Sequence, residues 1–403
     1  MLNRWVADFY FAGYVNDNLR HFRKYAESIA SGELPYRDFP VEYPPVSVLF
    51  LAALSPFAGE FDTFQGAFIA SMTLLSLLCW LGARASRTGN GRAGTLVEAA
   101  LYAGAVLSVG PIALVSLDYI PALFTVLALV FLCRGKAAMC GAALGVATAA
   151  KGYPAVLVIP AVLIVHGDGS GRRGALACFG AWAAAALCFT APAAAAGAGG
   201  FIRSIAYHAE RGPEIASVYG AVLLLMRLAG LKVATNFDHG SWNVAGHPLA
   251  SAAGNFSPVL TLILLALVYR RVWKSTIKTP AAGESRRTEE VRIRAGVAFS
   301  GAIAAFIAGF KVGSPQFLVW LAPFVPVWAG ARRGWALVGI FAAAGHLQQW
   351  IFPWHWSALV HVNPAAVGVL LIEKLLLVSV FALILAAMPA HGAKGGESAT
   401  GPG

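Results

Sequence analysis

The stretch GALACFGAWAAAALCFTAPAAAAGA, residues 174–198, contains no charged side chain. About twenty consecutive apolar residues in a helix are enough to cross the hydrocarbon core of a bilayer, so this segment indicates a transmembrane helix. The whole chain has the same character: 58% of its 403 residues are hydrophobic, 12% are charged, and the mean hydropathy is +0.67. A large soluble core would need charged faces on most helices. We therefore predict an all-α, polytopic membrane protein.

Apolar runs recur along the chain and predict about eleven crossings. We expect a single transmembrane domain over residues 1–388. The polar tail over 389–403, which ends in AKGGESATGPG, is expected to be disordered and cytoplasmic. The expected crossings are residues 64–84, 95–115, 119–133, 137–150, 153–166, 174–196, 256–272, 293–311, 316–331, 335–351 and 366–388.

Lys and Arg side chains indicate the orientation, because they concentrate on the cytoplasmic side of membrane proteins. The net charge of +11 is divided among short clusters between apolar runs, which argues against a nucleic-acid-binding face. All clusters fall on one side if residues 46–57 and 214–230 form re-entrant or interfacial helices on the outer face. That face then carries a first loop over 16–63 and a section over 198–255. The clusters are Arg84, Arg87 and Arg92; Arg134 and Lys136; Arg172 and Arg173; Arg270, Arg271, Lys274, Lys278, Arg286 and Arg287; and Arg332 and Arg333.

Charged residues gather in the first outer loop, where GELPYRDFPVEYPP covers residues 32–45. Ionisable groups at membrane depth are costly unless paired or hydrated, so they are functional candidates. Asp38 and Glu42 lie in a segment that prolines make rigid, and Asp17 lies where the chain leaves the membrane. We regard these three acids as candidate catalytic residues. A solvated amphipathic helix followed by a proline-framed turn explains the other charges of the loop.

A second charged stretch, YHAERGPEIASVYG, covers residues 207–220 and holds His208, Arg211 and Glu214. An Arg beside a His suits a phosphate or diphosphate, because the planar guanidinium makes paired, charge-assisted hydrogen bonds. The alternative is an interfacial helix anchored by snorkelling Arg and Tyr side chains.

Three isolated polar residues are further binding candidates. Asp118 in SLDYIPAL either lines a site or caps the helix that it opens, and Lys151 in AAKGYPAVLVIP lies at a turn before a helix that starts with proline. Gln316 in GFKVGSPQFLVWLAPF either lines a cavity or belongs to a helix end at Pro315. The five cysteines lie in apolar runs without metal-ligand spacing, so we expect neither a metal site nor a disulfide framework.

These motifs resemble those of a known family. Asp17, the segment KYAESIASGELPYRDFPVEYPP, SLDYIPAL, the AAKGYPAVLVIP turn, YHAERGPEIASVYG and SPQFLVWLAPF are similar to motifs of GT-C glycosyltransferases that depend on polyprenyl phosphates. The resemblance spans most of residues 14–360 and is to the bacterial glycosyltransferase family 87, whose members are mannosyltransferase-like.

The resemblance implies an inverting, cofactor-free and metal-independent enzyme on the extracytoplasmic face of the plasma (inner) membrane. It would move a hexosyl unit, with mannose the best guess, or a pentosyl unit from a polyprenyl-phosphate-sugar donor to a glycolipid or glycan acceptor. Membrane lipid is an implied partner, and nucleic acid is not. The implied roles are Asp17 as general base, Asp38 and Glu42 as substitute or substrate-binding acids, Arg211, His208 and Lys151 as phosphate ligands, and Asp118, Glu214 and Gln316 as further substrate-binding residues.

Two alternatives remain open from the residues. A transporter or flippase of lipid-linked sugars would also place charges beside the lipid, but its polar residues would continue through the bilayer. A lipid-linked oligosaccharide ligase would use outer-face Arg and His, but it leaves the acidic first loop unexplained. The chain also departs from the resembling family, which has a full helix before the acidic loop where this sequence has only MLNRWVADFYFAGYV. The resemblance therefore implies that the first helix lies upstream or is missing.

Overall fold

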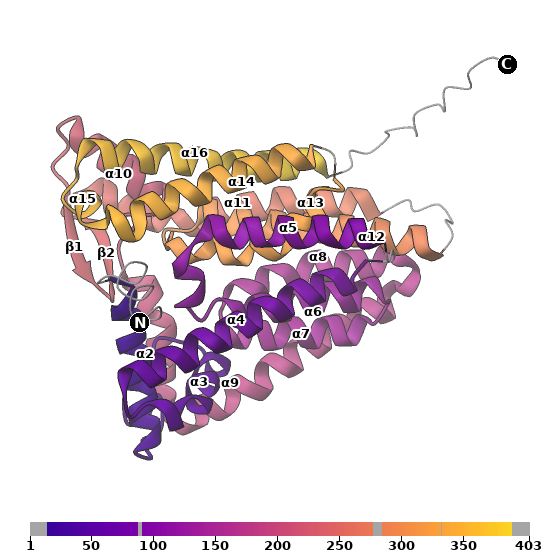
Figure 1. Ribbon diagram of the computed structural model, residues 1–403, viewed down its shortest axis with the longest axis horizontal. Helices are drawn as coiled ribbons and strands as arrows, with labels where there is room; N and C mark the ends of the chain where they lie inside the picture. Colours follow the sequence, from indigo (N-terminus) through magenta and orange to yellow (C-terminus); the bar gives the residue numbers. More distant parts are fainter. Residues whose placement is uncertain (1–13, 88–90, 277–283, 332, 389–403) are drawn as a thin grey trace.

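The computed structural model describes residues 14–87, 91–276, 284–331 and 333–388, and the tail predicted to be disordered lies outside this part of the chain. Long helices run side by side in Figure 1, and regular strands occur in these residues only as one short hairpin. The prediction of an all-α membrane protein is confirmed. The helices of the bundle are α4 (Phe61–Ala85), α5 (Arg92–Val109), α6 (Tyr119–Cys133), α7 (Ala137–Ala150), α8 (Val158–Val165, after the 3₁₀ turn η3, Tyr153–Leu157), α9 (Gly171–Glu210), α11 (Pro248–Thr276), α12 (Glu284–Gly309), α14 (Gly334–Gln349) and α16 (Pro364–Ala387).

Five helical segments of the described residues are long and apolar enough to cross a membrane. Each of the eleven expected crossings coincides with a helical segment, because apolar runs bounded by charges mark where helices lie in a bilayer. Several of these helices are shorter than a bilayer core requires, so the number of eleven crossings stays a prediction. The five long segments are Phe61–Ala85, Tyr153–Glu210, Pro248–Ser275, Thr288–Gly309 and Pro364–Ala387.

Most of the remaining elements lie toward the left end of the bundle in Figure 1, whereas α13 (Val325–Trp328) lies within the bundle. Two of them correspond to the stretches that we expected not to cross: α3 has nine residues and α10 has eleven, too few for a bilayer. The remaining helices are α2 (Tyr14–Ala30), α3 (Pro45–Ala53), α10 (Val218–Leu228), α13 (Val325–Trp328, after the 3₁₀ turn η5, Pro315–Trp320) and α15 (Trp356–Val360).

The hairpin was not predicted. Strands β1 (Ala234–Asp238) and β2 (Ser241–Ala245) pair antiparallel, with Asp238 opposite Ser241. The two residues between them, His239 and Gly240, both have positive φ angles, 46° and 63°. Positive φ angles at both loop residues match the twist of a two-residue hairpin, and glycine adopts such an angle without steric strain.

The bundle contains two hydrophobic clusters. The larger one occupies the centre of the bundle. The smaller one lies at the left end and joins α10, the hairpin, α15 and the start of α16, with Leu224, Val244 and Leu370 fully or almost fully buried. Residues of the 198–255 section pack into this smaller cluster, and this packing fixes the position of the residues between α9 and α10.

Candidate functional site

The loop between α2 and α3 is fixed by one carboxylate. Glu42 accepts a hydrogen bond from His21 Nε2 at 2.7 Å, and the hydroxyl of Tyr25 donates to its other oxygen. Both partners come from α2, which places Leu19 and Phe22 in the core and turns its polar face outward. Burial by itself would raise the pKa of Glu42, but the hydrogen bonds from His21 and Tyr25 outweigh it, and the pKa lies below its usual value.

The same loop rests on α9 through glycines. Tyr36 has a φ of 67°, and its hydroxyl donates to the carbonyl of Tyr43 at 2.6 Å. A Cβ on Gly200 would lie 1.9 Å from the Tyr36 carbonyl oxygen, and one on Gly197 would lie 2.5 Å from it. The two backbones therefore approach closely only because these positions lack side chains.

Asp118 and Lys151 form a pair between α6 and the turn after α7. Lys151 Nζ lies 2.6 Å from Asp118 Oδ1, and the indole N–H of Trp320 donates to the same oxygen. Asp118 is only 2% exposed. The ring of Trp320 stacks between Tyr153 and Phe317, with centroid distances of 3.9 and 4.0 Å. The sequence-based view of Asp118 as a simple helix cap is not what the geometry shows, since its side chain makes no cap hydrogen bond.

A second charged group surrounds Glu214. Its carboxylate lies 3.4 Å from Arg211 Nη2 and accepts from the backbone N–H of Gly313 at 3.1 Å and from the hydroxyl of Ser314 at 2.9 Å. Lys311 donates from Nζ to the carbonyls of Ala209 and Arg211, at 2.8 and 2.6 Å. These bonds tie the α9–α10 connection to the segment that follows α12.

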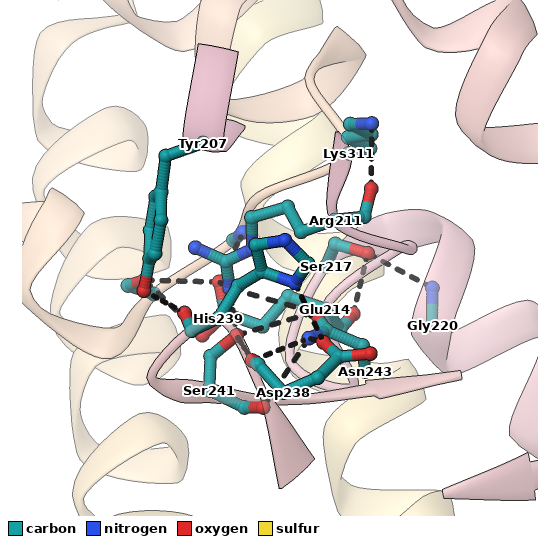
Figure 2. A network of polar contacts seen from close by, with 12 residues as sticks. Tyr207, Arg211, Glu214, Ser217, Gly220, Asp238, His239, Ser241, Asn243 and Lys311 are labelled. Atoms are coloured by element: carbon teal, nitrogen blue, oxygen red, sulfur yellow. Dashed lines mark hydrogen bonds and ion pairs between the residues drawn. The ribbon is translucent and has the colours of Figure 1, made fainter. Parts of the chain in front are cut away.

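The hairpin closes this group from the other side, as Figure 2 shows. Arg211 donates to the hydroxyl of Ser241, and the side-chain amide of Asn243 donates to Asp238. Arg211 is only 6% exposed, yet its Nε has no hydrogen-bond partner among the described residues. A buried guanidinium donor without a partner is an unused binding capacity for an anion.

We group these two sets of residues and Glu42 as one candidate site, because they influence one another electrostatically. His208 lies within electrostatic influence of Arg211, Lys151, Lys311 and Glu42, and Tyr43 lies within that of Glu42, Asp118 and Arg211. His208 itself is exposed, so the site reaches the protein surface there. We call this set the charged cluster; it consists of Glu42, Asp118, Lys151, His208, Arg211, Glu214 and Lys311.

Six of the nine candidate residues belong to the charged cluster, and three do not. Asp17 is exposed on the outer face of α2 and lines a shallow surface hollow with other α2 residues. Asp38 forms an ion pair with Arg37 and accepts from the N–H of Leu34, and these bonds lower its pKa to about 2. Such a weak base suits a structural role. Gln316 lies half-buried in η5, next to Phe317, without a described contact to the cluster.

Sequence reasoning missed the partners that complete the site. Lys311 lies in the same GFKVGSPQFLVWLAPF stretch as Gln316 and was, like Gln316, a candidate for lining a cavity, while His21, Tyr25 and Trp320 were not considered. The i, i+4 spacing of His21 and Tyr25 puts both on one face of a helix and was a usable signal. Trp320 and Asp118 are far apart in the chain, so no local sequence pattern predicts their contact. Among the described residues no group of three or more His, Cys, Asp or Glu side chains could hold a metal ion.

Glu42→Gln should lower the free energy of unfolding by about 1–2 kcal/mol at pH 7, because two charge-assisted hydrogen bonds weaken. A carboxyl whose folded pKa is depressed stabilises the fold above its unfolded pKa of about 4.3, and loses this contribution as the pH falls through the folded pKa. The difference between wild type and Glu42→Gln should therefore shrink from pH 6 to pH 3. Thermal unfolding of the detergent-solubilised chain measures it, with Glu33→Gln at an exposed position as the control. A difference that is constant over this range would refute the assignment.

The architecture and site define a multi-pass, all-α membrane protein with a charged cluster at one end of its bundle. The family model described as PIG-U, GPI transamidase subunit PIG-U, matches residues 14–228, which is more than half of the chain. The protein belongs to the PIG-U family. No curated protein matches it.

Membership of the PIG-U family corrects the function that we predicted from the sequence. The resemblance to family 87 mannosyltransferases does not hold, and the predictions of a glycosyltransferase and of sugar transfer from a polyprenyl-phosphate donor are wrong, because the matching family is that of a transamidase subunit. The family match favours neither a flippase nor an oligosaccharide ligase. The multi-pass membrane location is confirmed, while the plasma membrane and the outer orientation stay predictions.

Proposed function

We propose that this protein is a non-catalytic membrane subunit that holds a lipid anchor for a transamidase complex. The observation that carries the proposal is the match to GPI transamidase subunit PIG-U, whose 14–228 range contains every member of the charged cluster except Lys311. A transamidase transfers an acyl group from one amide nitrogen to another amine. A subunit of such a complex can contribute by positioning the lipid that carries the accepting amine.

The charged cluster suits the binding of an anionic lipid head group. Arg211 and Lys311 supply buried positive charge, and Lys151 and His208 lie closer to the surface. GPI lipids carry a phosphate between the lipid and the glycan, and a guanidinium with an unused N–H is a good phosphate donor. We propose Arg211 as the main phosphate ligand, with Lys151, Lys311 and His208 as supporting residues.

The cluster is less suited to breaking a covalent bond. Asp118 is paired with Lys151, and Glu214 is held by Arg211 and two donors from the segment after α12. No cysteine belongs to the cluster, and Cys79, Cys140 and Cys178 are buried within helices. Acyl transfer through a covalent intermediate needs a nucleophile activated by a base, so we assign this chemistry to another subunit.

Isolation of the tagged full chain from its native membranes tests the subunit role. We expect a stoichiometric complex with a subunit that carries a nucleophile and its base, and loss of amide-linked lipidated protein when the chain is deleted. Complementation by the wild type should restore the lipidated product. A chain that purifies alone, together with an unchanged amount of lipidated protein after deletion, would contradict the proposal.

A further inference from the structure

Helix α10 is apolar on both of its faces. It buries Ala221, Leu223 and Leu224 against the smaller hydrophobic cluster. On the other side it exposes Val222 and Leu225, each at 47%. A water-facing helix of a globular protein normally carries polar residues on its outer face, so this face is made for an apolar environment.

The residues around this face are those of a membrane interface. Phe237 in strand β1 is 63% exposed. Lys232 is exposed just beyond the end of α10, and Arg227 is half-buried in its last turn. Aromatic rings and snorkelling cations gather where the acyl chains meet the head groups.

The position of α10 in the bundle points to lipid as the occupant. It packs against α16 and α11, both of which belong to segments long enough to cross a membrane. These two helices expose further apolar side chains, among them Ile372 and Leu375 on α16 and Phe256 on α11, as expected of lipid-facing helices. Apolar side chains are thus exposed both on α10 and on the two helices against which it packs. With eleven residues, about 16 Å, the helix is too short to cross.

We propose that α10 lies within one leaflet as an interfacial helix. Val222, Leu225, Met226 and Phe237 would contact acyl chains, while the cations at its end would contact lipid phosphates. The inference does not depend on the transamidase role. The position of α10 also affects that role, because Glu214 lies four residues before α10 and pairs with Arg211. A helix in the leaflet would therefore set the charged cluster at the depth of lipid head groups.

Fluorescence quenching of the full chain in nanodiscs tests this position. An environment-sensitive fluorescent amino acid replaces Leu225 in one variant and Met226 in a second, and lipids brominated on their acyl chains act as quenchers. We expect at least twofold quenching at both positions. The control is the same residue in place of Lys24, which is exposed on α2, where we expect no quenching.

Two outcomes would overturn the proposal, provided that the variants elute as the wild type does. Positions 225 and 226 could stay unquenched by lipid and be open to aqueous iodide, which would place the face in water. They could also be shielded from both quenchers, which would mean that a protein surface covers α10.

Discussion

Replacing Gly200 with alanine is expected to detach the 31–44 loop from α9 and to lower the free energy of unfolding by about 2–3 kcal/mol, as overpacking of a close contact does. The new Cβ would lie 1.9 Å from the carbonyl oxygen of Tyr36 and 2.8 Å from its carbonyl carbon. These are backbone atoms, so no side-chain rotation relieves the overlap. Because Glu42 follows in the same loop, its bonds to His21 and Tyr25 should weaken as well.

Hydrogen–deuterium exchange of residues 31–44, together with thermal unfolding, measures the effect of Gly200→Ala. Gly199→Ala is a matched control on the same helix, since the nearest atom to its added Cβ is a side-chain nitrogen of Arg203 at 3.6 Å. We expect Gly199→Ala to leave exchange unchanged and to stabilise the helix slightly, by about 0.5–1 kcal/mol. Equal exchange in both variants would show that the loop is not seated on the α9 backbone.

Asp118→Ala should be the second strongly destabilising substitution, at about 3 kcal/mol, because removing one partner of a buried ion pair leaves the other charge uncompensated. Lys151 would lose its counter-ion, and the indole N–H of Trp320 would lose its acceptor. Asp118→Asn keeps an acceptor for Trp320 and should cost less. Denaturation of the purified chain in mixed micelles gives the difference in free energy.

The control for Asp118→Ala is Asp17→Ala, which removes an equal charge from an exposed position. We expect this substitution to change the free energy of unfolding by less than about 0.5 kcal/mol. If Asp118→Ala is no more destabilising than Asp17→Ala, the pair does not hold the start of α6, the end of α7 and η5 together.

The helices were predictable because the bilayer imposes a simple rule on the sequence. A run such as 174–196 has no charge and must be helical to satisfy its backbone in lipid, so the position of α9 follows from composition. The end of α9 at Glu210 was not predictable in the same way, since Gly197 has a non-helical backbone and a second helical piece follows it beyond the apolar run. The hairpin carried only the weak signal of His239–Gly240.

The sequence indicated most members of the charged cluster, but it indicated their arrangement in space only in part. Asp118, Lys151 and Arg211 stood out because ionisable residues beside apolar runs need partners. Their partners come from distant segments: Trp320 reaches Asp118, and Lys311 reaches the carbonyl of Arg211. The role of Asp17 as a general base came from a family motif and stays a prediction, and the structure shows only that this residue is exposed on α2.

Binding of a fluorescent, short-chain phosphatidic acid to the full chain in neutral detergent is the most direct test of the charged cluster as a lipid phosphate site. We compare the wild type with Arg211→Gln and with Arg203→Gln, which removes an equal charge from an exposed position of α9. Loss of a charge-assisted phosphate contact worth about 1.5–3 kcal/mol should weaken binding by roughly tenfold or more in Arg211→Gln. Arg203→Gln should change the affinity by less than about twofold, since exposed charges are screened. Equal affinities for all three chains would show that the cluster does not bind the lipid phosphate.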